Sequence, residues 1–589
     1  MSYLSPQHHR RAVLGRATAA ALATTLAATA VALTGASAQA APTSSTTLVV
    51  NANQTLRPVT HVGTGSLYGL ADDTTPPDSL VQALKPNTFV QMAPGGSQLP
   101  NGEPRPAGDA LVVAPKAARA GAKVVARMPD WYPDFPYKWV SMSDWLSAVD
   151  QQIAAVKASS ATNISAWAIW NEPDLNWDTA HAGPFDTAWN LTYKEIRSKD
   201  STTPIQGPSF SSYTHAKMQT FLQDAIANNA VPDVVAWHEL QTSANIAVHI
   251  ADYRALESSL GISPRPIDIE EYGTPDEMGN SGALIGYAAK FERAGVRDAE
   301  LAFWNHYGTL GDTLTDTGGS PNGSYWTYKW YGDMSGNMLV TTPPAQTGID
   351  GIASLNGAGN QISVVAGGCS GSCAVTVNGL TSLSAFGSTV HVKLEYSPNT
   401  GRLTASPGPI TVSEANYTVS GGSITVPVTM NAADGYHLVI TPSGTNTSLA
   451  GRYQITNKNS GLALDTSGAG TAQGTAVVQS TSTTATDQNW TLTAAGSGLY
   501  KIVNQKSGLL LGITNAGTAD GGTALIWGDN GTADHLWQVI PARDGYYKIA
   551  NYNSGRLLGV TGMSTSSGAQ VIQWSDNGTA DHLWKLTSR

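Results

Sequence analysis

The sequence predicts a multidomain chain that consists of a TIM barrel, a β-sandwich and a C-terminal domain of three β-rich repeats. The chain has 589 residues, too many for one ordinary domain, and its 60 glycines with only 13% charged residues indicate several β-rich modules. Between residues 59 and 304 short apolar runs alternate with helix-like stretches, and after residue 450 one pattern recurs three times. These two periodicities are the basis of the fold prediction.

Residues 1–40 are typical of a secretory signal peptide. They carry Arg10, Arg11 and Arg16 but no acidic residue, followed by a run rich in Ala, Leu, Val and Thr and by small residues before Ala40. We expect cleavage near Ala40 and a secreted, extracellular protein. The arginine pair loosely resembles a twin-arginine signal, which leaves the export route open.

Composition also restricts the partners that this chain is expected to bind. Removal of the three arginines in residues 1–40 shifts the formal net charge from −10 to −13, which argues against nucleic acid or an anionic membrane as a partner. The apolar run of the leader is broken by Thr and Gly and no second such run follows, so no membrane span is expected. With this acidic net charge, a neutral ligand is the more favourable partner.

The cysteines and the motif content predict a disulfide and no metal or cofactor. Cys369 and Cys373 are the two cysteines of the chain and lie four residues apart, a pair that an oxidising compartment would join. The sequence contains neither a Cys/His cluster with zinc spacing nor a phosphate-binding glycine loop with a lysine.

Residues 41–337 are predicted to form the barrel domain. Amphipathic segments such as 145–159 and 218–230 have the apolar spacing of helices and separate the candidate strands. Eight βα units in roughly 250 residues is the size of a TIM barrel. The eight candidate strands lie near Val62 and at 87–92, 122–128, 164–170, 203–209, 233–239, 265–271 and 299–305.

Residues 338–442 lack long helical patterns and alternate in the manner of β-strands. Candidate strands lie within 360–368, 374–380, 389–396, 423–430 and 435–441. About 100 residues of this kind predict a β-sandwich accessory domain. A short stretch rich in Ser, Thr, Gly and Asn, residues 443–450, is predicted to be a linker.

Residues 451–589 contain three copies of one unit. Tyr453, Tyr500 and Tyr547 recur at a step of 47 residues, and a tryptophan recurs at the same step at positions 490, 537 and 584. One copy cannot bury its apolar face alone, so three copies are expected to share a core. The repeats end in "QNW", "HLW" and "HLW", which resembles the Gln-x-Trp signature of ricin-type β-trefoil lectins.

The lectin resemblance implies sugar sites, although no repeat carries the full set of residues. In that family a sugar stacks on an aromatic residue and is held by an Asp early in the repeat and a polar residue after the aromatic. The first repeat lacks the aromatic, and the other two have Gly512 and Gly559 in place of the Asp. The alternative is that the two tryptophans only pack the trefoil. The candidate sugar-binding residues are Trp527, Asn530, Trp574, Asn577 and Asp465.

The segment "AWAIWNEPD" predicts a functional carboxylate at Glu172. An apolar strand is interrupted by Asn, Glu and Pro, and because Pro favours extended geometry before it and lacks a donor, the strand must end near Glu172. A carboxylate at the tip of an apolar strand is costly unless it faces a cleft. We therefore expect Glu172 to face one, since a Glu in a surface loop is the less favoured reading.

A partner carboxylate is expected in "IDIEEYG", three βα units further along. Glu271 lies 99 residues after Glu172, which places the two acids at the C-terminal ends of the fourth and seventh barrel strands. Side chains alternate along a regular strand, so only one of Glu270 and Glu271 should enter the mouth of the barrel. We expect Glu271 to enter it and Glu270 to pair with a basic side chain behind the barrel.

"WNEP" followed by Glu-Tyr-Gly resembles clan A glycoside hydrolases, and the barrel with a trailing β-domain resembles family 39 of that clan. The resemblance implies that Glu172 is the general acid/base and that Glu271 is the nucleophile. The apolar surroundings of Glu172 are expected to raise its pKa. The clan often has an Arg near the end of strand two that supports the nucleophile, whereas this sequence has Gln91 there and Arg127 on the next strand. Further candidates for substrate contacts are Asn171, His238, Trp304, Trp131 with Tyr132, and Tyr272.

The sequence thus predicts a secreted, retaining glycoside hydrolase that acts on a polysaccharide or its side chains, most simply as a monomer. Two alternatives stay open. One is a noncatalytic carbohydrate-binding protein, and the other is an inverting glycosidase that pairs Glu172 with Glu239 or Asp130.

Overall fold

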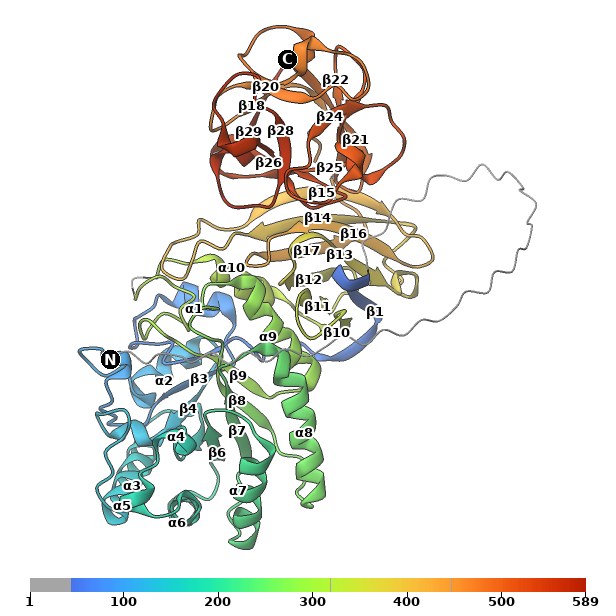
Figure 1. The fold of residues 1–589 in the computed structure, drawn as a ribbon. Helices are drawn as coiled ribbons and strands as arrows, with labels where there is room; N and C mark the ends of the chain where they lie inside the picture. Colours follow the sequence, from blue (N-terminus) through green and yellow to red (C-terminus); the bar gives the residue numbers. More distant parts are fainter. Residues whose placement is uncertain (1–43, 318, 446) are drawn as a thin grey trace, which may run out of the picture. The chain divides into compact units, whose positions relative to one another are not determined.

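The computed structural model describes residues 44–317, 319–445 and 447–589 (Figure 1). The predicted signal peptide lies outside these residues. Across the described ranges, no helix combines the length and the apolar character needed to cross a bilayer.

In the described part of the chain, eight parallel strands pair in sequence order and close into a barrel (Figure 1). The predicted TIM-like barrel is therefore observed, and each strand lies at or within a few residues of its expected position. The strands are β2 (Gly65–Leu67), β3 (Thr88–Met92), β4 (Lys123–Arg127), β5 (Ile164–Ala168), β6 (Ile205–Phe210), β7 (Val234–Glu239), β8 (Ile267–Tyr272) and β9 (Asp298–Leu301).

Several helices of the barrel domain begin at a polar side chain that accepts a backbone hydrogen bond. Ser141 accepts from the amide of Asp144, and Asn280 accepts from the amide of Ala283, both at 3.1 Å. Such caps stabilise a helix by about 1 kcal/mol and fix where it starts. The helices are α1 (Asp78–Leu84), α2 (Ala110–Arg119), α3 (Met142–Ala158), α4 (Pro173–Asn176), α5 (Thr179–Ala182), α6 (Phe185–Lys199), α7 (His215–Ala227), α8 (Ile246–Ser259), α9 (Ser281–Ala294) and α10 (Gly323–Asp333).

The barrel buries apolar side chains between its strands and helices, while its interior is partly polar. Trp167 and Trp237 are fully buried in the same cluster as the helix residues Trp189 and Tyr253. Inside the barrel, hydrogen bonds join strands that are not neighbours, such as β6 to β8 and β4 to β8. Side chains can bridge such strands only across the interior. The interior therefore holds a column of hydrogen-bonded and charged groups, which lies beside an apolar cluster that includes Val90, Val125 and Ala166.

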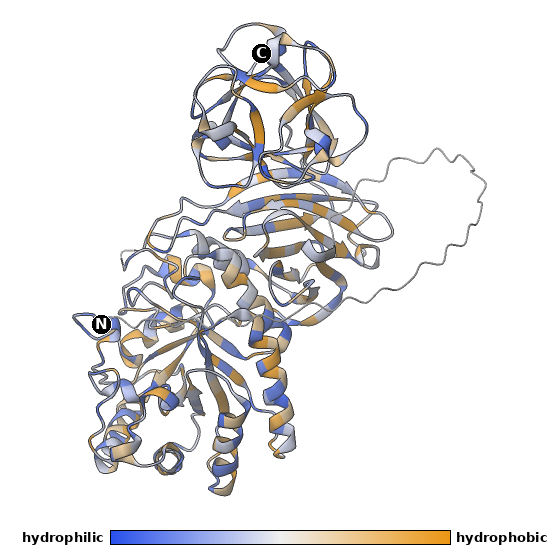
Figure 2. Cartoon of the chain, in the orientation of Figure 1, coloured by the Kyte–Doolittle hydropathy of each residue, from blue (hydrophilic) through white to orange (hydrophobic). Residues whose placement is uncertain are grey.

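The residues predicted to form a sandwich belong to a continuous nine-stranded sheet among the described residues. The strands hydrogen-bond in one continuous order and not as two separate sheets, so the predicted sandwich is not confirmed. In Figure 2 the strands of this sheet show both hydrophobic and hydrophilic colours along their length. The order is β15 (Ile410–Thr418), β14 (Thr389–Ser397), β17 (Gly435–Thr441), β12 (Ile362–Gly367), β11 (Asp350–Leu355), β10 (Asn337–Thr342), β1 (Thr47–Pro58), β13 (Gly371–Asn378) and β16 (Ile424–Met430).

Strand β1 departs from the expected domain boundary. Residues 41–337 are predicted to belong to the barrel domain, yet β1 pairs with β10 and β13 and completes the sheet. Its alternate residues Leu48, Val50 and Ala52 are buried in the core of the sheet. The period-2 pattern of β1 fits either domain, so only the tertiary pairing assigns it.

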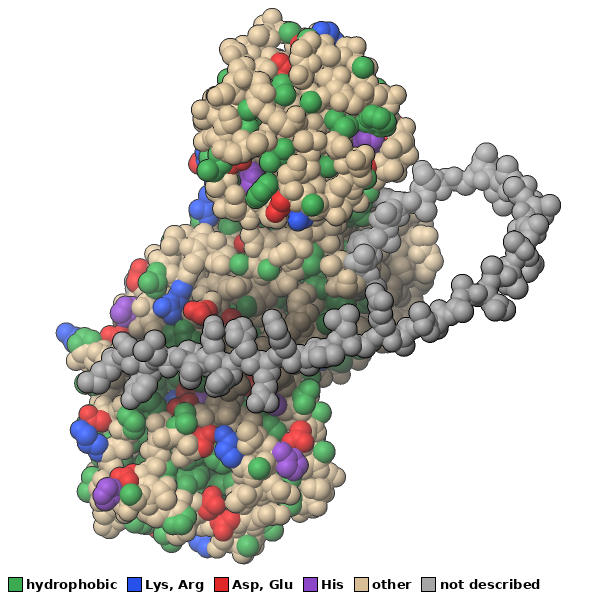
Figure 3. All heavy atoms as spheres, in the orientation of Figure 1, with side chains coloured by type: hydrophobic (Ala, Val, Ile, Leu, Met, Phe, Trp, Pro, Cys, Tyr) green, Lys and Arg blue, Asp and Glu red, His purple; other side chains and the backbone are tan. Residues whose placement is uncertain are grey.

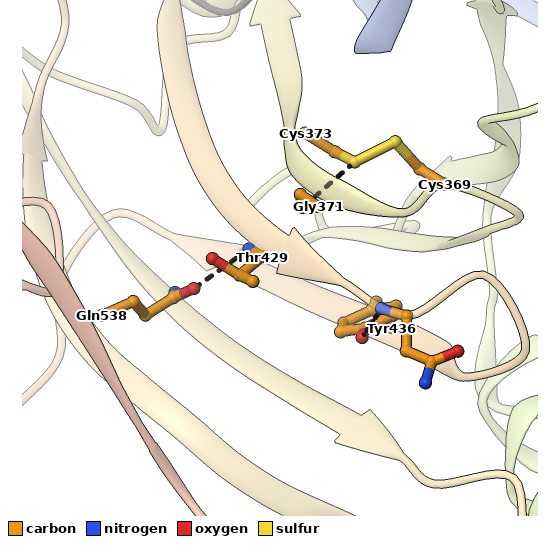
Figure 4. The surroundings of a disulfide bond; sticks show 7 residues. Cys369, Gly371, Cys373, Thr429, Tyr436 and Gln538 are labelled. Atoms are coloured by element: carbon orange, nitrogen blue, oxygen red, sulfur yellow. Dashed lines mark hydrogen bonds between the residues drawn. A yellow bond between two sulfur atoms is a disulfide. The ribbon is translucent and has the colours of Figure 1, made fainter. Parts of the chain in front are cut away.

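The predicted disulfide is present. Cys369 and Cys373 are bonded at the turn that leads into β13, and the carbonyl of Gly371 lies beside the Cys373 sulfur (Figure 4). Both cysteines are buried in the core of the sheet. The bond therefore closes a tight local loop.

The three repeats of residues 451–589 form a set of equivalent units. Trp490, Trp537 and Trp584 are fully buried, and each indole donates to a backbone carbonyl 26 residues earlier. Each is also paired in register with the repeating tyrosine. The packing role predicted for these residues is thus observed. The strands are β18 (Gly451–Asn457), β19 (Ala463–Thr466), β20 (Val477–Ser480), β21 (Asn489–Gly496), β22 (Leu499–Asn504), β23 (Leu510–Ile513), β24 (Ala524–Trp527), β25 (Trp537–Pro541), β26 (Tyr547–Asn551), β27 (Leu557–Val560), β28 (Val571–Trp574) and β29 (Trp584–Ser588).

The surface carries few charges of either sign. On the face drawn in Figure 3, acidic, basic and hydrophobic side chains are scattered among uncharged groups. This distribution agrees with the low charged content of the sequence and with a neutral ligand rather than a polyanion.

Candidate active site

The chain turns sharply at Glu172. Strand β5 ends at Ala168, four residues earlier than predicted, and Glu172 adopts a left-handed backbone conformation with φ 48° directly before α4. Its amide donates to the carbonyl of Ser209 at 2.9 Å, which fixes the turn against β6. The carboxylate is mostly buried, with its side chain 14% exposed, and its Oε2 accepts from Asn176 Nδ2 at 3.1 Å. The predicted placement of a carboxylate at a turn beyond the strand is therefore observed.

Strand β8 is irregular at its C-terminal end, which alters the expectation for Glu270 and Glu271. Trp237 of β7 is in register with Ile269, but the next residue, His238, is in register with Glu271. The extra residue is a β-bulge, and a bulge breaks the strict alternation of side chains. As a result, both carboxylates lie near the imidazole of His238. Its Nε2 is 3.7 Å from Glu270 Oε2 and 3.8 Å from Glu271 Oε1.

The expected position of Glu270 is wrong. It was predicted to pair with a basic side chain behind the barrel, but it is fully buried inside the barrel, where its Oε1 accepts from Gln206 Nε2 at 2.7 Å. The bulge explains the error, because regular geometry would have sent Glu270 and Glu271 to opposite faces.

Arg127 supports Glu271 from across the barrel. Its Nη1 donates to Glu271 Oε1 at 2.8 Å, and the two side chains are only 2% and 11% exposed. Gln91, at the position where an Arg was expected from the family resemblance, is buried, and its side-chain amide lies against the backbone of Leu70 and Gly108. The supporting cation therefore comes from β4 rather than β3. A buried, charge-assisted bond of this kind holds the Glu271 side chain in place.

His238 lies between the two candidate catalytic carboxylates. Its Nδ1 is 3.3 Å from Glu172 Oε1, and its Nε2 is 3.8 Å from Glu271 Oε1. The imidazole is fully buried. The predicted proximity of His238 to the site is observed, and the ring links both carboxylates.

The charges of these groups determine their protonation. Burial alone would lower the pKa of His238, but the charges of Glu271, Glu172 and Glu270 raise it to about 10. Burial alone would raise the pKa of Glu172, but the hydrogen bond and charge of His238 lower it. The expectation that apolar surroundings raise the pKa of Glu172 is therefore wrong, because a neighbouring imidazolium outweighs desolvation.

The remaining candidate substrate contacts divide into two groups. Asn171 is buried beside Glu172, and its Oδ1 has no hydrogen-bond partner among the described residues. Trp304 lies three residues beyond β9, is half-buried, and donates to the carbonyl of Gly273 at 3.2 Å. Trp131 is also half-buried and its ring covers Gly95. These three remain candidates for sugar contacts.

Tyr272 and Tyr132 do not fit the roles expected for them. Tyr272 is fully buried, and its hydroxyl donates to the carbonyl of Gly63 at 2.6 Å and lies 2.8 Å from the hydroxyl of Tyr328. It therefore packs against the helices, on the opposite side of β8 from the barrel interior. Tyr132 is buried and donates to Asp144 at 2.8 Å.

The two acids considered as alternative bases are already engaged by protein groups. Glu239 is buried and its Oε1 accepts from Trp237 Nε1 and lies by His249 Nδ1, both at 2.8 Å. Asp130 is fully buried and accepts from the hydroxyls of Tyr68 and Tyr137. Neither carboxylate faces solvent where a water could be activated, which disfavours the inverting alternative.

The exposed tryptophans of the repeat domain occupy equivalent positions. Trp527 and Trp574 end β24 and β28 and are 40% and 41% exposed, so the predicted exposed indoles are present. Asn530 and Asn577 follow them, and each amide oxygen accepts from a threonine two residues later. A hollow of about 530 Å³ beside Trp574 is lined by Asn577, Asp581, His582 and Met563 among others.

A compensating pair that the sequence analysis missed explains the two glycines. In the first repeat, Asp465 accepts from Gln488 Nε2 at 3.0 Å. At Gly512 and Gly559 an added Cβ would lie 2.3 Å and 2.4 Å from the rings of His535 and His582, which replace the glutamine. The first repeat therefore combines Asp with Gln at these two positions, and the second and third repeats combine Gly with His. The change from "QNW" to "HLW" was the signal that could have revealed this.

Comparison with known proteins finds relatives of this chain among solved structures. N2152 from Neocallimastix frontalis is 36% identical and is matched over its whole length, with 68% of this chain covered and a TM-score of 0.64. The chain belongs to the same family as N2152. A glucosidase from Croceicoccus marinus has the same fold at 11% identity, with a TM-score of 0.51 and 68% of this chain covered.

Two curated relatives have named activities. A 3-O-alpha-D-galactosyl-alpha-L-arabinofuranosidase of Bifidobacterium longum subsp. longum is 29% identical over 64% of this chain and 39% of its own length. A 3-O-beta-L-arabinopyranosyl-alpha-L-arabinofuranosidase of Bifidobacterium pseudocatenulatum is 28% identical over 64% of this chain and 46% of its own length. The chain thus spans less than half the length of either relative.

The repeat domain matches a second family. Residues 436–527 and 533–589 match the family described as ricin-type beta-trefoil lectin domain-like. The predicted lectin-type trefoil is therefore confirmed.

Proposed function

We propose that this chain is a secreted, retaining glycoside hydrolase of the clan A type that cleaves arabinofuranosyl linkages in the side chains of a polysaccharide. The observation that carries the proposal is the group formed by Glu172, His238, Glu271 and Arg127 at the C-terminal end of the barrel, where TIM-barrel active sites are built. Two largely buried carboxylates, one at the turn after β5 and one at the end of β8 held by an Arg, suit double displacement.

Each carboxylate has one role in this mechanism. Glu271 attacks the anomeric carbon and forms a glycosyl-enzyme ester, while a proton passes from Glu172 to the leaving oxygen. Water then attacks the anomeric carbon, Glu172 accepts its proton, and Glu271 is released as carboxylate. The Arg127 hydrogen bond holds the Glu271 carboxylate in position for attack.

The substrate class is inferred from two sources. The curated relatives are named as α-L-arabinofuranosidases that act on arabinofuranose substituted at O3. The weakly charged surface favours a neutral glycan over a polyanion. We therefore place O3-substituted and unsubstituted α-L-arabinofuranosides first among the substrates to test.

The substrate assignment is tested with a panel of glycans and aryl glycosides. Purified protein is incubated with arabinogalactans, O3-substituted α-L-arabinofuranosides, β-xylosides and microbial exopolysaccharides, and the anomer of the first product is followed by NMR. Release of arabinofuranosyl products with retained configuration is expected. Inverted products would favour the inverting alternative, and sugar binding without any hydrolysis would favour the noncatalytic one.

The trefoil is proposed to keep the enzyme near its polysaccharide. Two half-exposed indoles followed by Asn side chains provide apolar stacking faces and polar groups for a sugar. Binding through the trefoil raises the local substrate concentration without changing the chemistry of the barrel.

Replacing both Trp527 and Trp574 with Ala is expected to weaken binding to polysaccharide but not hydrolysis of a small aryl glycoside. Each lost stacking face is worth about 0.5–1.5 kcal/mol, or roughly two- to tenfold in affinity. Pull-down on insoluble or immobilised glycan and kinetics on the small substrate measure the two effects separately. Val248→Ala, which removes an exposed apolar side chain of α8, is the matched control. Equal binding by the double variant and by wild type would assign both tryptophans to packing alone.

A further inference from the structure

The two ring nitrogens of His238 both face carboxylate oxygens. Nδ1 is 3.3 Å from Glu172 Oε1, and Nε2 is 3.7 Å from Glu270 Oε2 and 3.8 Å from Glu271 Oε1. A neutral imidazole would direct a lone pair at one of these carboxylates, because only one of its nitrogens carries a hydrogen. The arrangement is electrostatically satisfied when both nitrogens are protonated.

Glu270 is the member of this group that the proposed chemistry does not use. Its side chain is 0% exposed, so it lies beneath the surface that a sugar could reach. One of its oxygens is held by Gln206, and the other, Oε2, has no hydrogen-bond partner among the described residues and faces His238. A buried carboxylate without a second partner is costly unless a cation lies beside it.

Other charged groups face the Glu270–His238 pair from the neighbouring strands. Arg127 of β4 lies on the side of Glu271, and its charge lowers the pKa of Glu270. Deeper in the barrel, burial raises the pKa of Asp268 to about 7 and that of Glu300 well above its usual range. Arg297 contacts both Asp268 and Gln206 at the base of the column. Glu270, whose pKa is lowered by His238 and Arg127 against the effect of burial, is therefore the ionised acid beneath the imidazole.

We propose that Glu270 is a positioning residue that keeps His238 doubly protonated, so that the proton delivered to the leaving group is stored on His238 Nδ1 and passes to it through Glu172. This inference rests on the proposed function. It resolves a conflict within the site, since an acid/base residue beside a permanent cation would otherwise be held ionised and unable to donate.

The proton transfers balance over the two steps. In the first, the Nδ1–H bond breaks as Glu172 Oε1 gains the proton, and the neutral carboxyl group then gives this same proton to the departing glycosidic oxygen as the glycosidic bond breaks. His238 becomes neutral, Glu172 remains ionised, and the negative charge of Glu271 is lost as its ester forms. In the second step, a proton from the attacking water returns through Glu172 to Nδ1, and Glu271 regains its charge. No oxidant, metal or further acid is needed.

A second buried pair of the same kind provides a control. Glu239 lies on the neighbouring strand, is buried, and contacts His249 at 2.8 Å, and among the described residues no ion pair or side-chain hydrogen bond joins either of them to Glu172 or Glu271. Substituting Glu239 with Gln therefore removes a comparable buried charge without touching the group around His238. A general effect of losing a buried carboxylate would be seen in both variants.

For the wild-type enzyme, kcat/KM is expected to fall on the basic side only at high pH. The cation on His238, with a raised pKa of about 10, is present at neutral pH and is lost only as pH rises through that value. In Glu270→Gln one negative charge beside the imidazole is gone, so its proton is lost at lower pH, and the basic limb should fall by on the order of one to two pH units. Glu270→Asp keeps the negative charge, so the apparent pKa of its basic limb should stay close to that of the wild type. Glu239→Gln should match the wild type.

The protonation of His238 is also measured without catalysis. In histidine-labelled full-length protein, the ¹⁵N spectrum at pH 8 should contain an imidazolium signal that is absent from His238→Gln and that titrates at lower pH in Glu270→Gln. Two results for the wild-type protein overturn the proposal even if Glu270→Gln does not fold. One is a fall of kcat/KM with an apparent pKa in the ordinary range of carboxyl groups. The other is a neutral His238 at pH 8. Because this signal does not depend on turnover, its presence in a protein that hydrolyses no glycoside would contradict the proposed function while leaving the Glu270–His238 pair intact.

Discussion

Glu271→Gln is expected to lose on the order of 10⁴-fold or more in kcat, because no other group can form the glycosyl-enzyme ester. The amide is not nucleophilic, yet it has the shape of the carboxylate and can still accept the Arg127 hydrogen bond through its oxygen. Binding of substrate should therefore survive with little change in affinity. Initial rates on an aryl glycoside and calorimetric binding of a slow substrate measure these two quantities.

External nucleophiles provide the positive identification of Glu271. Glu271→Gly leaves room for azide, which should restore product formation with inverted configuration at the anomeric carbon, because a single displacement now replaces two. The control variant is Glu239→Gln. The Glu239 side chain is also buried but lies outside the site, so this variant should retain activity. Full activity in Glu271→Gln would remove this residue from the mechanism and return Glu270, which also reaches His238, to consideration.

Glu172→Gln is expected to lose about 10²–10⁴-fold in kcat on substrates with poor leaving groups, the usual contribution of general acid–base catalysis. Substrates with acidic leaving groups need little protonation, so the first step should survive for them while hydrolysis of the glycosyl-enzyme becomes slow. A burst of aryl alcohol followed by a slow steady state is the expected time course.

The position of the acid/base residue is tested by the slope of rate against leaving-group pKa. The slope should steepen in Glu172→Gln, because protonation no longer assists departure of the leaving group. Asn176→Ala, which removes a hydrogen bond to Glu172 Oε2 without removing the carboxylate, should retain the wild-type slope. An unchanged slope in Glu172→Gln would mean that the acid is another residue.

The barrel and the trefoil were predictable because their signals are periodic and local. Eight alternations of apolar and helical segments specify a TIM barrel, and a 47-residue repeat specifies three units with a shared core. Glu172 was predictable for the same reason, since Asn-Glu-Pro after an apolar run forces a turn at the strand end. Strand β1 was assigned to the wrong domain because its alternating pattern does not reveal its hydrogen-bond partners.

The chemistry of the site was only partly predictable. The sequence supplied the two carboxylates and His238, but the bulge that admits Glu270 arises from a mismatch in register between β7 and β8. Likewise, the lowered pKa of Glu172 follows from the distance to a buried imidazole, not from its apolar neighbours. The pairing of Gly512 with His535 is also a contact between residues 23 positions apart.

The sequence by itself determined the order of domains, the turn at Glu172 and the placement of two acids at the same end of the barrel, because these depend on spacing and on the backbone preferences of single residues. Only the tertiary structure decided which cation supports Glu271, which side Glu270 faces and how His238 is charged. Those properties depend on distances between strands that are far apart in the chain, and on burial, which makes a charge at such a distance strong enough to reverse a pKa shift.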